Sequence, residues 1–369
     1  MAHNGYADAM GDAYDRLTGL GYERGDGMDL ANHGPMGAEA LAAMGFGDEV
    51  AAWVEDYKRA VSHHAPPEPR FALDAGDEQS WREALGQFDR VGDWEELFAR
   101  ELVENPWRDV MNRWWPRLLA GVMAGLTHGL IRTAHAVRCL AAADTPQELA
   151  LNELARGLAY WAARYTLLPG DVAWTGQHTV AEAIVNLSGN FGEETNPGMR
   201  RAGLGENPSY RAALRTLSPQ GAGRRLSEMT SVFAGVYLGH PEAPPVPLIH
   251  GVTAPAALRM VLPHLSEEHH AVSTAAIWRV QVALLFMFSR TGGGSDRLID
   301  AADVDKLSWR DLFGRALVHG DEHVIKFTEA CYRENVIQPD PRFAAAVGAA
   351  LQLIPVRALG GGAATVARR

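Results

Sequence analysis

The sequence predicts an all-α protein, mainly helical with minor or no strand. Apolar residues recur at the 3.6-residue spacing of helices along most of the chain. Clusters of glycine and proline separate these segments, and few segments alternate apolar and polar residues as a half-buried strand does. With 369 residues, 47% hydrophobic and 21% charged, the chain can bury a large core. We expect a single compact helical domain over residues 1–369.

The helical spacing marks most of the elements, and proline marks the breaks between them. We expect helices at 8–20, 37–44, 49–62, 81–88, 94–104, 107–115, 146–165, 180–187, 254–262, 267–289 and 309–335. The apolar run 118–131 predicts a buried core helix that carries His128 and is too short to span a membrane. Prolines predict a break at 241–247. Residues 189–225, rich in glycine, asparagine, proline and arginine, predict a long loop with short helical pieces, suited to a lid. Residues 360–369 predict a frayed tail.

Composition and missing motifs remove several classes of protein. The net charge of −11 argues against nucleic acid or an anionic membrane as a partner. The two cysteines, Cys139 and Cys331, form no CxxC pair, so neither a disulfide framework nor a cysteine zinc site is expected. We find no secretory signal, and cytoplasmic location fits best. The chain has no dinucleotide-binding GxGxxG, GxxxxGK[ST], GxSxG or HExxH motif, so we expect no flavin or NAD(P) cofactor.

One predicted helix carries three polar side chains on one face. His128, Arg132 and His135 stand at positions i, i+4 and i+7 among small and apolar neighbours. Groups buried in such surroundings need a partner, and neutral imidazole is a ligand for iron, zinc, copper and nickel. A lone histidine of this kind is more often a core residue bonded to a carbonyl or carboxylate. Arg132 fits a structural ion pair as well as it fits a group that binds a substrate oxygen.

A second helix repeats the pattern with a lysine. His319, His323 and Lys326 share a face, unless Gly320 ends the helix early and removes His319 from it. Lys326 is one of three lysines among 34 basic residues, so we favour a role that arginine cannot fill over a solvent-directed helix edge. A buried lysine can lose its proton and then bind metal, act as a base, or form a carbamate with carbon dioxide.

The remaining candidates lie outside these two helices. His33 stands out in an Asn-His-Gly-Pro-Met segment, whereas His250, which is weak evidence when taken alone, follows the proline-rich break, just before the predicted helix at 254–262. Tyr160, Trp161 and Tyr165 could line an aromatic pocket for a substrate. Their spacing is also that of core packing, which we favour.

Together these segments resemble the questin oxidase-like family. The similar segments are 32–35, 128–132, 154–165, 248–253 and 321–326, in order along most of the chain. The resemblance implies an O2-dependent oxygenase that acts on a small aromatic substrate, an anthraquinone-like polyketide. The implied reactions are carbon–carbon cleavage and Baeyer–Villiger-type ring opening.

The resemblance also implies a non-heme Fe(II) site with a carboxylated lysine. The implied ligands are His33, His128, His250, His323 and Lys326, with His135 and His319 as alternates. Arg132 and Gly34 depart from many fungal relatives, which bears on the substrate more than on the metal. A zinc- or nickel-dependent hydrolase or lyase on the same ligands, and a non-catalytic helical ligand-binding protein, are the alternatives. The sequence leaves the oligomeric state open, a homodimer included.

Overall fold

The computed structural model describes residues 3–25, 30–187, 196–289, 298–303 and 307–357. Within these ranges the chain forms 17 α-helices. Backbone pairing of the β type there is limited to four isolated bridges, and no strand is formed. The all-α class predicted from helical periodicity is therefore confirmed.

Most helices are short, and they follow one another closely along the chain. In chain order they are α1 (His3–Leu17), α2 (Gly34–Ala43), α3 (Gly47–Ala60), α4 (Glu78–Ala84), α5 (Val91–Glu104), α6 (Trp107–Leu118), α7 (His128–Ala141), α8 (Glu148–Ala163), α9 (Val180–Val185), α10 (Pro197–Gly203), α11 (Pro208–Ala213), α12 (Ala222–Gly239), α13 (Pro245–Val261), α14 (Glu268–Phe288), α15 (Trp309–His319), α16 (Glu322–Ile337) and α17 (Pro341–Leu353).

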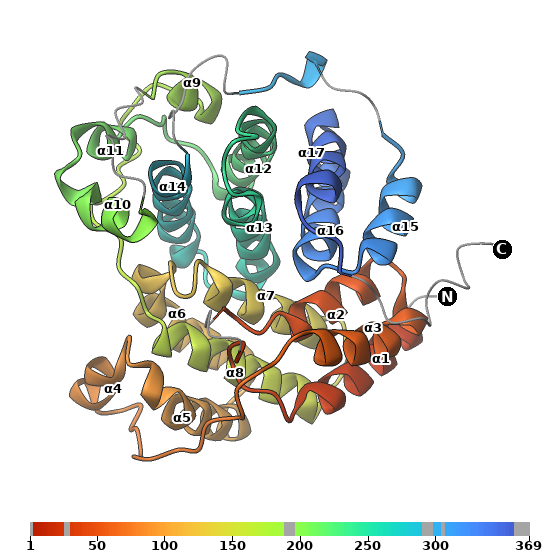
Figure 1. Cartoon of the computed structure of the whole chain (residues 1–369). Helices are drawn as coiled ribbons and strands as arrows, with labels where there is room; N and C mark the ends of the chain where they lie inside the picture. The colour runs from red at the N-terminus through yellow and green to blue at the C-terminus, as the bar shows by residue number, and fades with distance from the viewer. Residues whose placement is uncertain (1–2, 26–29, 188–195, 290–297, 304–306, 358–369) are drawn as a thin grey trace.

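The helices form two groups (Figure 1). In the upper half of the view, α12, α13, α14, α16 and α17 stand side by side, while α1–α3 and α5–α8 lie beneath them. The groups meet where α7 packs on α13 and where α2 packs on α16. Segments far apart in the sequence thus come together at this junction, and the candidate site lies there.

Two stretches of the upper group are apolar almost all round. Pro245–His264 and Glu268–Phe288 are long and apolar enough to cross a membrane, judged by length and composition alone. In both, 72% of the qualifying window is buried inside the protein, as in the core helix of a folded domain. Their apolar surface is thus largely covered by the chain itself.

The predicted continuous helix before His128 is wrong. α6 ends at Leu118, and α7 begins only at His128. Residues 125–127 between them have φ angles of 53°, 57° and 69°, which are left-handed and cannot continue a right-handed helix. His128 therefore stands at the first position of its helix, and the glycines at 121 and 125 lie in the preceding turn.

The predicted helix 309–335 is two helices. Gly320, with φ 74°, ends α15 in the left-handed conformation that glycine adopts without a Cβ clash. The Asp321 side chain then accepts hydrogen bonds from the backbone N–H groups of His323 and Val324 and caps α16. His319, at the end of α15, consequently does not share a face with His323.

The proline-rich segment before His250 starts a helix instead of ending one. α13 begins at Pro245, and prolines are tolerated in a first turn because its N–H groups have no partner within the helix. His250 consequently lies inside α13, whereas we expected it ahead of the helix.

The predicted long loop at 189–225 is partly helical. It contains α10 and α11, which both pack on α14, and α12 already begins at Ala222. Residues 188–195 of this segment and the predicted tail at 360–369 lie outside the described ranges. Helix α17 was not predicted.

Candidate metal centre

Five predicted ligand residues converge at the junction of the two groups of helices. His33 precedes α2, His128 opens α7, His250 lies within α13, and His323 and Lys326 lie in the first turns of α16. All five side chains are buried. The fold thus brings histidines from three helices and from the residue before a fourth to one place that water barely reaches.

Three of the histidines lie close enough to hold one metal ion. The His33 ring centroid lies 4.5 Å from that of His128 and 4.5 Å from that of His323. One ring nitrogen from each of the three falls within 4.8 Å of the other two. The His250 ring stands beside the group, 4.7 Å from the His128 ring.

The hydrogen bonds of His33 and His128 fix where their protons sit. His33 Nδ1 lies 3.2 Å from Glu322 Oε1, and His128 Nδ1 lies against the carbonyl oxygen of Gly125. Because both partners are acceptors, each Nδ1 carries the hydrogen. Burial, together with the charges of Lys326 and the neighbouring histidines, holds the pKa of both imidazoles well below the usual value. Both rings are therefore neutral, and each Nε2 has a bare lone pair.

These two lone pairs point at each other. The Nε2 atoms of His33 and His128 lie 2.7 Å apart. Two lone pairs at this distance repel, and a cation bound by both removes the repulsion. Nitrogen ligands about 2.1 Å from a metal and at right angles lie about 3 Å apart, so a small movement is enough to seat an ion. The donor set therefore fits a metal.

His323 is oriented in the same way. Its Nδ1 lies 3.1 Å from Asp321 Oδ1, the same oxygen that caps α16. Burial acts to raise the Asp321 pKa, but the hydrogen bond from His323 and the charge of Arg357 lower it to about 2. A carboxylate or carbonyl that holds the distal N–H is the usual support of a metal-binding histidine. Three rings of the cluster have such a partner.

Sequence reasoning missed the groups that support the ring of His33. Glu322 receives its Nδ1–H and also forms an ion pair with Arg357, close to the end of the described chain. The Arg357 guanidinium lies over the Tyr57 ring, 5.1 Å from its centroid, and the Tyr57 hydroxyl accepts the backbone N–H of His33. Glu322 directly precedes the predicted ligand His323 in the sequence, and this position could have indicated a supporting role for it. No spacing links Arg357 or Tyr57 to the histidines.

Lys326 is buried without an ion pair. No carboxylate among the described residues lies within ion-pair distance of its amine. Burial lowers its pKa from 10.5 to about 8, against the opposing charges of Glu322 and Asp321. A fraction of the amine is consequently neutral near pH 7.

Lys326 and His250 both line a small cavity. Its lining includes His250, Thr253, His135 and Ile131, and its volume is about 10 Å³. Such a space accommodates about one water molecule. An aromatic ring does not fit there.

The two alternate histidines have protein partners of their own. His135 also borders the cavity, but its Nδ1 is hydrogen-bonded to Glu39. His319 Nε2 lies 3.0 Å from the carbonyl oxygen of Ile354. Neither belongs to the group of nitrogens around His33.

Arg132 forms a buried ion pair. Its Nε and Nη2 atoms donate to the two carboxylate oxygens of Glu153 at 2.6 and 2.9 Å. The guanidinium also lies over the Tyr22 ring, 5.3 Å from its centroid. For Arg132, the sequence fitted a structural ion pair as well as a group that binds a substrate oxygen. The structure shows the ion pair, with Glu153.

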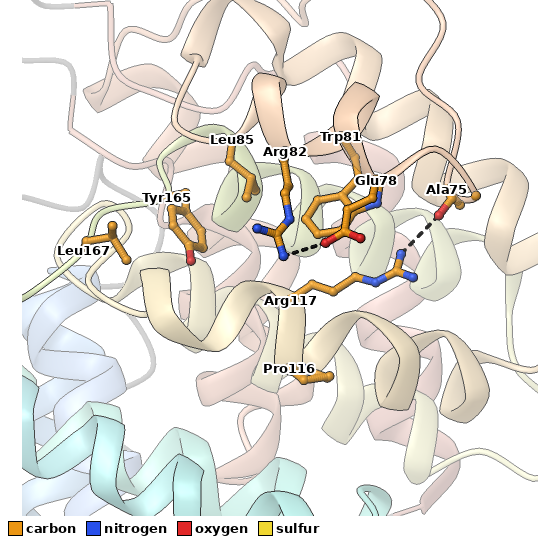
Figure 2. Close-up of a pocket in the computed structure, with 10 residues that line it drawn as sticks. Ala75, Glu78, Trp81, Arg82, Leu85, Pro116, Arg117, Tyr165 and Leu167 are labelled. Carbon is orange, nitrogen blue, oxygen red and sulfur yellow. Dashed lines mark hydrogen bonds and ion pairs between the residues drawn. The ribbon is translucent and has the colours of Figure 1, made fainter. Parts of the chain in front are cut away.

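The three aromatic candidates do not surround the histidines as one pocket. The Tyr160 hydroxyl donates to Glu23 at 2.9 Å, and Trp161 is fully buried with its ring against Trp115. Tyr165 lines an open surface groove of about 750 Å³ beside α4 and α6 (Figure 2). In the close-up, Arg117 reaches a backbone carbonyl across this groove. Core packing accounts for the first two residues.

Fold and cluster define a helical protein with a buried histidine site suited to a metal. The model of the questin oxidase-like family matches residues 30–176, which confirms the family resemblance predicted from the sequence. The matched part contains His33 and His128, whereas His250, His323 and Lys326 lie beyond it. No curated protein matches the chain. The family suggests an oxygenase that acts on aromatic polyketides.

Proposed function

We propose that the protein is a non-heme iron-dependent oxygenase. Its substrate is an anthraquinone-like polyketide, opened by carbon–carbon cleavage or a Baeyer–Villiger-type reaction. The observation that carries the metal site is the opposed pair of Nε2 atoms in His33 and His128, each with its Nδ1 held by an oxygen acceptor. The family match supports the class of substrate.

The proposed ligand set has a core of three histidines, His33, His128 and His323, and is completed by His250 and Lys326. Lys326 enters as a carbamate. Its neutral amine attacks the carbon of CO2, a nitrogen–carbon bond forms as one carbon–oxygen π bond opens onto oxygen, and one proton leaves the nitrogen for solvent water. The product is an anion in place of a cation, so it supplies an oxygen ligand. The lowered pKa of Lys326, its missing ion pair and the small cavity beside it support this step.

Bound iron would supply the reactivity toward dioxygen. The protein's own groups prepare the site for it. Glu322, Asp321 and the Gly125 carbonyl hold the Nδ1–H groups, so the Nε2 lone pairs face inward. Burial of the cluster keeps bulk water out. The adjoining cavity is too small for an aromatic ring, so an aromatic substrate requires the helices lining it, α7, α13 and α16, to separate locally.

Elemental analysis of protein purified without added metal tests the proposal. We expect near-stoichiometric iron in the wild type and its loss in His33→Ala and His323→Ala. His319→Ala is the matched control, because that histidine is buried on α15 and its side chain bonds only to the Ile354 carbonyl among the described residues. It should retain iron. Iron-loaded protein supplied with an external two-electron reductant should then consume O2 with anthraquinones and release ring-opened products.

The other outcomes separate the alternatives. Zinc or nickel in place of iron, with activity that persists without O2, would indicate a hydrolase or lyase on the same ligands. Protein that contains no metal and takes up no ferrous iron would contradict the metal site. A helical ligand-binding protein would then be the better description.

A further inference from the structure

The turn before α7 has an unfavourable backbone. Gly125, Leu126 and Thr127 are left-handed in succession, with φ angles of 53°, 57° and 69°. Glycine adopts this conformation freely, but Leu126 and Thr127 do so at a cost, which is greatest for the β-branched threonine. Within the described part of the chain, these two are the only non-glycine residues with positive φ. Such residues persist where the surroundings hold them, often at functional sites.

Thr127 also does not cap its helix, although it stands at the N-cap position. It stands at the N-cap of α7, where a threonine hydroxyl usually accepts a backbone N–H of the first turn. It makes no such bond, and its side chain is fully buried. The hydroxyl oxygen instead lies 2.9 Å from Nδ1 of His250, on α13.

We infer that Thr127 is a positioning residue of the metal centre. Its hydroxyl accepts the Nδ1–H of His250, so that Nε2 is left with the lone pair that a metal needs. The inference rests on the proposed metal site. It gives His250 the same kind of support that Glu322 gives His33 and Asp321 gives His323.

One short turn therefore orients two imidazoles that belong to different helices. The Gly125 carbonyl holds Nδ1 of His128, and the Thr127 hydroxyl holds Nδ1 of His250. A right-handed turn would point this carbonyl and this hydroxyl elsewhere. The left-handed backbone of this turn thus places the hydrogen-bond partners of both the His128 and the His250 ring.

Tyr160 packs against this turn. A Cβ atom added to Gly125 would lie 2.7 Å from the Tyr160 hydroxyl, so only glycine fits there. That hydroxyl is fixed by its hydrogen bond to Glu23. Tyr160 therefore lies directly against the turn that carries Thr127.

The first test is the tautomer of His250 in metal-free protein, measured by nitrogen-15 NMR. Thr127→Val removes the hydroxyl at nearly constant shape, and Thr127→Gly removes both the hydroxyl and the strain. Thr127→Ser keeps the hydroxyl, and Leu126→Gly relieves strain without touching the bond. We expect the wild type, Thr127→Ser and Leu126→Gly to hold the proton on Nδ1. Thr127→Val and Thr127→Gly should lose that preference.

The second test is titration of the same five proteins with cobalt(II) and iron(II). Affinity should fall roughly 10–100-fold in Thr127→Val and Thr127→Gly, as for other lost partners of metal-bound histidines, and should hold in the two controls. Thr127→Gly should melt at or above the temperature of Thr127→Val, so a loss of affinity in it does not reflect unfolding. An unchanged tautomer and affinity in both variants would overturn the inference. If even the wild type binds no metal, the proposed function fails, and the tautomer result alone decides the role of Thr127.

Discussion

The Nε2 atoms of His33 and His128 lie 2.7 Å apart, and each ring carries its hydrogen on the opposite nitrogen. A proton between the two atoms would relieve the repulsion, but burial and the nearby positive charges hold both pKa values well below neutral. A divalent cation shared with His323 relieves it as well, and the carboxylates of Glu322 and Asp321 partly balance the added charge.

Metal binding should stabilise the fold for this reason. We expect anaerobic iron(II) or cobalt(II) to raise the melting temperature of the metal-free protein. At a concentration of 100 times Kd the gain is about 2.7 kcal/mol. His33→Ala should show no such shift, and His319→Ala should show all of it. Differential scanning calorimetry measures both. An equal shift in His33→Ala would mean that the ion binds elsewhere.

The Lys326 amine should matter through its uncharged form. Lys326→Met keeps most of the length of the side chain without a charge, so we expect a folded protein. Bicarbonate should increase iron uptake by the wild type and leave uptake by Lys326→Met unchanged. Carbon-13 NMR with labelled bicarbonate should show a carbamate signal only in proteins that contain Lys326. Lys58→Met, which removes a partly exposed lysine on α3, is the control and should behave as wild type. A bicarbonate effect that survives in Lys326→Met would contradict the carbamate.

The sequence predicted the helical class well because apolar periodicity reports directly which face of a helix is buried. It predicted helix ends less well where one residue decides them. Gly320 was recognised as a risk to its helix, since glycine is the usual residue of a left-handed terminus. The sequence did not indicate the left-handed turn at Leu126 and Thr127, because neither residue type is associated with positive φ.

The sequence predicted only part of the candidate site, because a local pattern does not show which helices pack against each other. Histidine spacing within one helix suggested His128 and His323, and the family resemblance added His33 and His250. Spacing cannot say which histidine faces which helix. Contacts such as that between Arg357 and Glu322 depend on the packing of the whole chain, and no local pattern encodes them.

The ion pair of Arg132 with Glu153 should be structural. Arg132→Met leaves the buried Glu153 carboxylate without its partner, and removal of one member of a buried pair costs about 3–5 kcal/mol. We expect that loss in urea unfolding, with iron content unchanged. The double variant Arg132→Met/Glu153→Leu should recover much of it. Weaker substrate binding by a fully stable Arg132→Met would instead support a role in holding the substrate.

Acid should weaken the contact between α7 and α16 through Glu329. Burial acts to raise the pKa of this carboxyl, but Arg138 and Arg333 lower it from 4.5 to about 2. A carboxyl with a lowered pKa in the folded state contributes stability that is complete above about pH 4.5 and is lost as the pH falls toward 2. The contribution is on the order of 3 kcal/mol.

Urea unfolding between pH 7 and pH 3 measures this contribution. The stability advantage of the wild type over Glu329→Gln should shrink steadily below pH 4.5. Glu104→Gln changes an exposed carboxylate at the end of α5 and should follow the wild type at every pH. A constant difference between the wild type and Glu329→Gln would mean that the arginines do not act on Glu329 in the folded state.

Gly314 within α15 and Gly320 at its C-cap should respond to alanine in opposite ways. Gly314 lies within the helix, and a Cβ atom there meets open space, so Gly314→Ala should stabilise the protein by about 0.5–1 kcal/mol. Gly320 has φ 74°, where alanine is strained, so Gly320→Ala should lower the stability of the protein by about 1 kcal/mol or more.

Alanine at position 320 also favours continuation of α15 into Asp321, which would remove the Asp321 side chain from Nδ1 of His323. Gly320→Ala should therefore bind iron more weakly as well, whereas Gly314→Ala should bind it as the wild type does. Urea unfolding and iron titration of the two variants check both effects. A loss of stability in Gly320→Ala with full metal affinity would show that His323 does not depend on the cap of α16.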